Sequence, residues 1–312
     1  MAKKGKAVNR RKSSGGRPPY VALLVVLAVI VVVVLLLEQT RKKVSVPEQK
    51  KVETPLHLKM PERTAPAQQP MSTAVAAPEK KEPVEPAPRP HGSGTVAIII
   101  DDMGTNVSEV RELLAIGQPL TFSVIPSLAK AKAVAEIAHS AGAEVMVHMP
   151  MEPQGYPKQR MEKIGLLLSM DDAEVAQRVK GYFQTVPFAV GANNHMGSRF
   201  TEDAGKMETV LTVLKERGMF FIDSRTSPAS VGLETARELG VKTAARQVFL
   251  DNVQDDALIR KQLQQAVSIA RKRGSAIAIC HPHPATIRAL RGALPGIARE
   301  GITFVHVSKL VR

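Results

Sequence analysis

The sequence predicts an α/β fold in which roughly seven or eight short, buried, parallel strands alternate with helices and form an irregular barrel. From residue 95 onward, apolar runs alternate with segments whose apolar residues recur at helical spacing. Capping residues and glycines separate the two kinds of segment, and polar side chains gather directly after the apolar runs. An open, doubly wound sheet is the alternative, but no glycine-rich nucleotide-binding sequence follows a predicted strand.

The apolar runs place the expected strands, in order, at residues 95–102, 120–126, 144–148, 188–192, 219–223, 248–250, 275–280 and 302–307. The first expected helix lies between Ser127, which can cap its start, and Gly142, which ends it. Further helices are expected at residues 171–185, 203–217, 231–239 and 255–272. Apolar residues three and four positions apart mark residues 203–217 and 255–272 most clearly.

Residues 20–37 form a run of 18 residues without a charged side chain. A membrane-spanning helix needs about 17–25 such residues, and lipid leaves helix as the only single-segment solution. A cleaved signal peptide is the alternative, but its apolar core is shorter and ends at a small-residue cleavage site. Seven basic residues precede the run and three follow it directly. We therefore expect a single-pass anchor in the inner (cytoplasmic) membrane, with residues 1–19 as a cytoplasmic tail and the C-terminal domain in the periplasm or extracytoplasmic space.

Residues 38–94 contain ten of the 22 prolines and few large apolar side chains. Such a composition cannot bury enough surface to offset the entropy lost on ordering. We expect a disordered, extended linker here, with a peptidoglycan- or partner-binding segment as the alternative. The folded domain is expected to occupy residues 95–312.

The net charge of +14 lies mostly outside that domain, because residues 95–312 hold 26 Lys and Arg beside 22 Asp and Glu. A nucleic-acid surface needs a basic cluster on the folded domain, and the sequence shows none, so no nucleic-acid partner is expected. The single cysteine, Cys280, excludes an intramolecular disulfide. Because it ends an apolar run, we expect a buried structural thiol.

Polar residues follow most of the predicted strands. In a β/α barrel the carboxyl ends of the strands meet on one face, which is where active sites lie. One such residue alone is more often structural, but several that converge on one face favour a functional site, and four of the eight histidines fall there. The residues concerned are Asp101, Asp102, His148, Glu152, Asn194, His195, Arg199, Asp223, Arg225, Asp251, His281 and His283.

Carboxylates and imidazoles are a normal ligand set for zinc and similar ions, with one position left open for water. The metal lowers the pKa of that water and polarises a carbonyl group. A nearby carboxylate can take the water proton, and a histidine can protonate the leaving group. Within a strand Asp101 and Asp102 would point to opposite sides, but at a strand end one can bind metal while the other acts as base. The sequence therefore predicts metal-assisted hydrolysis, with zinc as the expected divalent ion.

The chain resembles the divergent polysaccharide deacetylases, which are relatives of the NodB-type carbohydrate esterases, over about residues 95–312. The resemblance rests on residues 101–104 (DDMG), 148–152 (HMPME), 193–198 (NNHMGS), 221–225 (FIDSR) and 281–284 (HPHP). It implies an irregular (β/α) barrel of the NodB or glycoside hydrolase/deacetylase type. It also implies an envelope polysaccharide or peptidoglycan-like glycan as the partner.

The resemblance implies catalytic roles for three residues. Asp101 corresponds to the base and His281 to the late histidine that acts as general acid, with His283 as an alternative for that role. Arg199 corresponds to an arginine with an orienting role, although the flanking sequence differs. We further expect Asn194, Asp223, Arg225 and His283 to contact the substrate.

The implied metal ligands match the family pattern only in part. Asp102 and His148 match, but the NodB-type second motif ends in His-x-x-x-His, and Glu152 stands where the second histidine would be. Glu152 could bind the metal itself, His195 could supply the missing imidazole, or the site could bind metal weakly.

Two functions therefore compete. The first is a membrane-anchored, metal-dependent deacetylase that acts on an envelope polysaccharide. The second is a catalytically weak or inactive carbohydrate-binding or scaffold protein of the cell envelope. The acid pair and His281 favour the enzyme, whereas the incomplete His-x-x-x-His motif favours the binding protein. The absence of tryptophan removes one common sugar-stacking side chain from both.

Overall fold

A computed structural model describes residues 93–312. The predicted tail, anchor and linker therefore lie outside the described residues, apart from Ser93 and Gly94 at the end of the linker. Within residues 93–312, no helix combines the length and the apolar character that crossing a membrane requires.

Nine strands of the described region form one sheet in which every pairing is parallel. In chain order the strands are β1 (Gly94–Met103), β2 (Thr121–Val124), β3 (Glu144–Met151), β4 (Ala189–Met196), β5 (Phe220–Asp223), β6 (Thr243–Ala245), β7 (Val248–Phe249), β8 (Ser275–Cys280) and β9 (Ile302–Val305). The sheet order is β6-β5-β4-β3-β2-β1-β8-β7, and β9 pairs with β1. The predicted parallel α/β class is confirmed.

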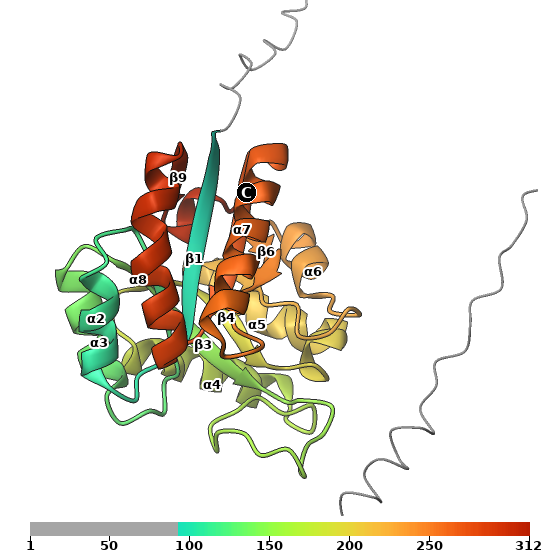
Figure 1. The fold of residues 1–312 in the computed structure, drawn as a ribbon. Helices are drawn as coiled ribbons and strands as arrows, with labels where there is room; N and C mark the ends of the chain where they lie inside the picture. The colour runs from blue at the N-terminus through green and yellow to red at the C-terminus, as the bar shows by residue number, and fades with distance from the viewer. Residues whose placement is uncertain (1–92) are drawn as a thin grey trace, which may run out of the picture. The chain divides into compact units, whose positions relative to one another are not determined.

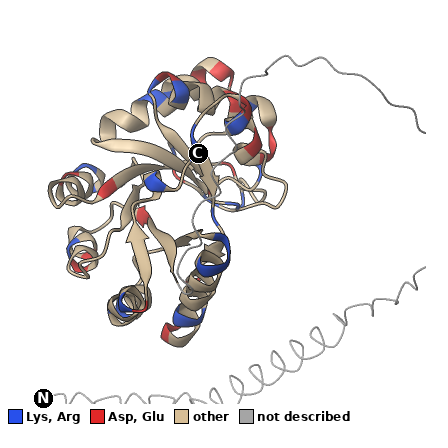
Figure 2. Ribbon diagram, turned by 90° about the horizontal axis from the view of Figure 1, so that it is seen from above, with Lys and Arg blue, Asp and Glu red and all other residues tan. Residues whose placement is uncertain are grey.

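The sheet is a curled half-barrel with its helices on the outside (Figures 1 and 2). Its two edge strands, β6 and β7, are consecutive in the chain and are separated only by Arg246 and Gln247. They are not paired with each other, so residues 243–249 carry the chain from β5 on one side of the opening to β8 on the other. Sequence patterns missed β6, because Thr-Ala-Ala has too few apolar residues to stand out as a strand.

The helices are α2 (Val107–Leu114), α3 (Ala131–Ser140), α4 (Asp172–Thr185), α5 (Ala204–Glu216), α6 (Gly232–Glu238), α7 (Asp256–Arg273) and α8 (Pro284–Arg299). Side chains of Asp171, Asp203 and Asp255 cap α4, α5 and α7 by accepting backbone hydrogen bonds. These three helices begin where the sequence predicted. Helices α2 and α8 were not predicted.

Helix α3 begins later than predicted. Residues 126–130 form turns, and Lys130, not Ser127, precedes the helix. The backbone N–H of Lys130 donates to the carbonyl of Gly104, and that of Leu128 donates to Ile125. These bonds tie the segment to the loop after β1, so the helix starts only beyond it.

Strand β1 is an interior strand of the sheet and lies between α7 and α8 in Figure 1. One of its edges pairs with β8, and the other pairs first with β9 and then with β2. A Cβ atom on Gly94 would lie 2.7 Å from the backbone of Ala270 in α7, so only glycine permits this close approach at the start of the strand.

Alternate residues of β1 face opposite sides of the sheet. Val96, Ile98 and Ile100 belong to the larger hydrophobic cluster, which lies between the sheet and the helices. Ala97 and Ile99 belong to a smaller cluster that also contains Met146, Ile222, Ile277 and Ile279 from neighbouring strands. This smaller cluster fills the inner side of the curl and forms the floor beneath the polar residues described next.

Candidate active site

Three polar side chains continue the apolar rows of the inner cluster at the carboxyl ends of their strands. Asp101 follows Ala97 and Ile99 on β1, His148 follows Met146 on β3, and His281 follows Ile277 and Ile279 just after β8. The period of two along each strand brings them to one face of the curl. The predicted convergence of strand-end residues is thus present for these three.

Asn193 on β4 connects Asp101 to His148. Its amide nitrogen Nδ2 donates to Asp101 Oδ1 at 2.9 Å and to Ser224 Oγ at 3.1 Å. Its oxygen Oδ1 lies 2.6 Å from Ser123 Oγ and 2.8 Å from His148 Nδ1. The opposite amide orientation would set oxygen against the Asp101 carboxylate, so Oδ1 is the acceptor and His148 Nδ1 carries a proton. The lone pair of neutral His148 is therefore on Nε2.

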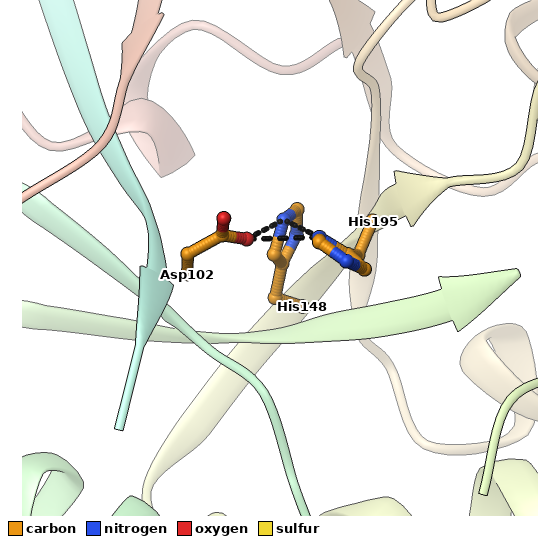
Figure 3. Close-up of side chains that lie close together, drawn as sticks. All are labelled: Asp102, His148 and His195. Atoms are coloured by element: carbon orange, nitrogen blue, oxygen red, sulfur yellow. Dashed lines mark hydrogen bonds and ion pairs between the residues drawn. The ribbon is translucent and has the colours of Figure 1, made fainter. Parts of the chain in front are cut away.

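That lone pair faces two other ligand atoms (Figure 3). His148 Nε2 lies 3.2 Å from Asp102 Oδ1 and 3.1 Å from His195 Nδ1, and the latter two atoms are 2.8 Å apart. Ligands of one tetrahedral zinc, at bond lengths of about 2.0–2.1 Å, are separated by roughly 3.3 Å. We name Asp102, His148 and His195 the cation triad.

The backbone of Asp102 makes this convergence possible. Its φ of +57° takes the residue out of extended geometry, so Asp101 and Asp102 do not point to opposite sides as they would in a regular strand. Asp102 Oδ1 is buried and faces His148 Nε2 at 3.2 Å and His195 Nδ1 at 2.8 Å. A carboxylate oxygen and two imidazole nitrogens that converge in this way are the ligand types that zinc and similar ions take. The residues present therefore fit a divalent ion.

The electrostatics separate the two adjacent acids. Burial raises the pKa of Asp101, and the His148 charge and the Asn193 hydrogen bond offset this only in part. Burial also acts on Asp102, but the imidazoles of His148 and His195 outweigh it and hold the pKa of this carboxyl well below its usual range. Asp102 thus remains an anion, whereas the raised pKa of Asp101 suits a group that takes up and releases a proton.

A second cluster lies beside the cation triad. Asp251, just after β7, has one oxygen 3.1 Å from His281 Nδ1, and its other oxygen accepts from the backbone N–H of His281 at 2.7 Å and from Thr286 Oγ1 at 2.8 Å. Burial lowers the pKa of His281, but the hydrogen bond with Asp251 and nearby carboxylates raise it to about 9. His281 Nε2 then points toward the triad, 3.7 Å from Asp102 Oδ2.

His283 lies at the edge of this second cluster. Its ring centroid is 5.6 Å from that of His281, and its backbone precedes α8. Asp251, His281 and His283 offer ligand atoms within 4.8 Å of one another. Because Asp251 holds His281 Nδ1, only Nε2 of His281 is directed at the triad.

Glu152, an expected metal ligand, has both carboxylate oxygens engaged by the chain itself. Glu152 Oε1 accepts from Arg199 Nη1 at 2.7 Å, and Oε2 accepts from the backbone N–H of Leu168 at 2.8 Å. Glu152 is absent from both metal-compatible groups of the described residues. It joins two loops instead, and Arg199 orients Glu152 and not a residue of the triad. Of the sequence alternatives, His195 is the residue that supplies the second imidazole.

Asn194 and Asp223, which were expected to contact the substrate, are both buried, and the chain itself engages their polar atoms. Asn194 Oδ1 accepts from the N–H of Ser224, and its Nδ2 donates to the carbonyl of Met196. Asp223 accepts from the N–H of Arg225 and from Ser230 Oγ. Both residues fix loop geometry. Arg225 is exposed at the same face, with a φ of +53°.

Sequence reasoning did not assign roles to Asn193, Asp251 or Arg246. Asp251 follows an apolar run, which was the available signal, and Asn193 stands beside residues that were singled out. Arg246 donates to the carbonyl of Ser224 at 2.7 Å, and its charge acts on Asp101. No sequence pattern marks Arg246, because it lies in the opening between β6 and β7 that only the folded chain reveals.

Known proteins resemble this chain in sequence and in fold. The family model of the divergent polysaccharide deacetylases matches residues 98–311. "Uncharacterized protein YibQ" of Escherichia coli K12 is 38% identical over 219 residues, which cover 70% of this chain and 68% of that protein. An uncharacterized protein of Haemophilus influenzae is 39% identical over 217 residues, which cover 70% and 76%. The crystal structure of the uncharacterized protein ATU2773 from Agrobacterium tumefaciens C58 has a TM-score of 0.67 at 24% identity and covers 72% of this chain and 92% of that one. The last likeness concerns the fold.

Proposed function

Because the chain belongs to the divergent polysaccharide deacetylase family, we propose that it removes N- or O-linked acetyl groups from an envelope polysaccharide. The observation that carries this proposal is the placement of three different chemical roles around one point. The cation triad, the buried carboxylate of Asp101, and His281 with its carboxylate partner all lie at one end of the curled sheet. In metal-assisted hydrolysis of an amide or ester, the ion acts as Lewis acid, a base takes the proton of the water, and an acid protonates the leaving group.

Asp102, His148 and His195 would hold the divalent ion, and zinc suits a set of one carboxylate and two imidazoles. When bound, the ion would polarise the acetyl carbonyl and make water a stronger nucleophile at neutral pH. The hydrogen bond between His148 Nδ1 and Asn193 Oδ1 fixes the ring and keeps the lone pair of Nε2 directed at the ion.

Asp101 accepts a proton from the attacking water. Its oxygen Oδ2 lies 3.5 Å from His148 Nε2, so the base sits directly against the triad. Burial raises the pKa of the carboxyl, which makes its carboxylate a stronger base. Asn193 Nδ2 donates to Asp101 Oδ1 at 2.9 Å and holds the carboxyl group in place.

His281 protonates the departing amine or sugar oxygen. Asp251 holds Nδ1, which leaves the N–H of Nε2 free to donate. Because the pKa of His281 is raised to about 9, the ring is protonated near neutral pH. The reaction requires the base and the acid to start in opposite protonation states, an anionic Asp101 and a protonated His281.

A glycan-binding protein without turnover is the second candidate. The observation that favours it is Glu152, which stands at the position of the family's second histidine and is held by Arg199. The arrangement of Asp102, His148 and His195 supports the enzyme over this alternative, since His195 fills the ligand position from a different strand.

Acetate release from acetylated chitooligosaccharides and from acetylated peptidoglycan fragments tests the proposal on the purified full chain. We expect zinc-dependent turnover that chelation removes and zinc restores. The second candidate would be favoured if the zinc-loaded protein binds these glycans but releases acetate from neither N-linked nor O-linked acetyl groups.

We also propose that residues 20–37 anchor the protein in the inner membrane and that the C-terminal domain acts outside the cytoplasm. The seven basic residues before the apolar run support this orientation. A reporter that is active only in the cytoplasm, fused after Arg312, should be silent. An active reporter would place the C-terminal domain in the cytoplasm and contradict the proposed orientation.

The linker proposal is tested separately by thermal unfolding. Chains that begin near residue 40 and near residue 92 should melt at nearly the same temperature, because a linker of this composition contributes no core. A large loss of stability in the shorter chain would assign residues 38–94 a structural role.

A further inference from the structure

Glu162 lies in the loop between β3 and α4, which no sequence pattern marked as part of the site. Its carboxylate oxygen Oε2 is buried and has no hydrogen-bond partner among the described residues. The ion pair that the structure gives it is with His195, whose Nε2 lies 3.6 Å from Oε2. A buried carboxylate oxygen without a donor is costly, so this placement requires an explanation.

The loop holds Glu162 in a defined position. The N–H of Gly165 donates to the carbonyl of Glu162 at 2.8 Å, and the N–H of Leu166 donates to Pro150 on β3 at 2.8 Å. The N–H of Leu168 donates to the buried carboxylate of Glu152. The backbone on the C-terminal side of Glu162 is therefore tied to the strand that carries His148.

His195 presents its two ring nitrogens to different partners. Nδ1 belongs to the cation triad, 2.8 Å from Asp102 Oδ1 and 3.1 Å from His148 Nε2. Nε2 faces Glu162. A neutral imidazole has one N–H and one lone pair. If Nδ1 offers its lone pair to a cation, the proton must be on Nε2, where Glu162 is the available acceptor.

We propose that Glu162 is a positioning residue for His195: it accepts the Nε2 proton and thereby holds the ring with Nδ1 directed at the metal. The inference rests on the metal-binding part of the proposed function. Histidine ligands of metals commonly donate their second N–H to a carboxylate, which fixes the tautomer and raises ligand basicity. The present distance exceeds a hydrogen bond, and a shift of about 0.6 Å brings it to roughly 3.0 Å.

Glu162 thus compensates for the missing His-x-x-x-His motif. His148 has its ring fixed by Asn193, whereas His195 comes from the end of β4, beyond which the backbone turns at Met196 with a φ of +52°. A ligand at a strand end needs an external restraint, and Glu162 provides it from the neighbouring loop.

Metal affinity of the full chain, measured by competition with a chromogenic chelator, tests the inference without any substrate. Glu162→Ala should weaken zinc binding about 10- to 100-fold, the usual effect of removing a carboxylate behind a histidine ligand. Glu162→Gln keeps an acceptor oxygen and should lose less. Lys163→Ala, an exposed neighbour in the same loop, is the matched control and should bind zinc like the wild type.

A double-mutant cycle separates positioning from a general loss of negative charge. If Glu162 acts through His195, Glu162→Ala should cost nothing further in a His195→Ala background. Unchanged affinity in Glu162→Ala, or a full additive loss in the double variant, would overturn the inference.

Nitrogen-15 and proton spectra of histidine-labelled, zinc-loaded protein provide a second readout, because without the ion His195 Nδ1 faces the Asp102 carboxylate at 2.8 Å. The Nε2–H of His195 should exchange slowly with water in the wild type, and Glu162→Ala should make it exchange faster. If the wild type binds no zinc, the proposed function fails at its metal site and the inference fails with it. If the wild type binds zinc but Glu162→Ala leaves the Nε2–H exchange unchanged, only the inference is overturned.

Discussion

The two histidine clusters at the end of the curled sheet differ in what holds the inner ring nitrogen. His148 Nδ1 is held by the amide oxygen of Asn193, which is neutral, and His281 Nδ1 is held by the carboxylate of Asp251, which is charged. The amide partner fixes the ring of His148 and directs its outer nitrogen at the triad. The pKa of His148 is nonetheless raised, because the effect of burial is outweighed by Asp101 and Asp102. The carboxylate partner of His281 itself favours the protonated ring, as a general acid requires. The two rings are therefore held by different means, one by an amide and the other by a charged group.

The largest expected effect separates the clusters by metal content. His148→Ala removes a triad ligand, so purified protein should lose most of its bound ion and all measurable turnover. His281→Ala should retain the ion and lose turnover, because His281 lies outside the triad. Elemental analysis of both variants beside the wild type measures the difference. Equal metal loading of His148→Ala and the wild type would remove His148 from the metal site.

Asp101 borders both clusters, since the charges of His148 and His281 both act on it. Asp101→Asn changes the charge with little change in volume, so folding and metal content should be preserved. Acetate release should fall about 100-fold or more, which is the usual scale of general base catalysis. Near-normal turnover by metal-loaded Asp101→Asn would show that the base is another residue.

Asp251→Asn makes the second cluster resemble the first, by replacing a charged partner with a neutral amide. The pKa of His281, which Asp251 helps to raise to about 9, should then fall. The alkaline limb of the pH profile of kcat/KM should move to lower pH, while metal content stays constant. An alkaline limb that stays at the same pH would show that it does not report the titration of His281.

The smallest expected effect concerns the pH dependence of the free energy of unfolding. The folded-state pKa of His281 is raised from 6.5 to about 9, so its contribution is fully present below 6.5 and is lost as pH rises through 9. The pKa of Asp251 is lowered from 3.8, so its contribution is present above 3.8 and is lost as pH falls through the folded-state value. The destabilisation caused by Asp251→Asn should therefore be largest between about pH 4 and 6.5 and should shrink above pH 9. Denaturant melts across this range measure it, and a pH-independent difference would mean that the pair contributes no charge interaction.

The sequence was informative where period and chemistry coincide. The apolar runs of β1, β3 and β8 placed Asp101, His148 and His281 at the ends of buried strands, and apolar residues at helical spacing located α5 and α7. Short or weakly apolar elements were not predicted, such as β6 with its Thr-Ala-Ala sequence.

Side-chain partners were harder to predict than positions. Glu152, Asn194 and Asp223 stand in the segments that drew attention, but each is bound by a neighbouring loop. Conversely, Glu162 and Arg246 reach the site from loops whose path depends on tertiary packing. A sequence indicates which strand a residue follows. The hydrogen bonds that its side chain makes depend on chain segments that are distant in sequence, so the sequence does not reveal them.

The unpaired opening between β6 and β7 has a consequence for local stability. Amide exchange should be slowest in β1, which is hydrogen-bonded along both edges, and fastest among the strands in β7, a two-residue strand at the edge of the sheet. Asp251 lies two residues after the end of β7, whereas Asp102 lies near the end of β1. Transient opening of the sheet would therefore separate Asp251 from His281 while the ligand on β1 stays in place, so warming should diminish proton donation before the protein releases its ion.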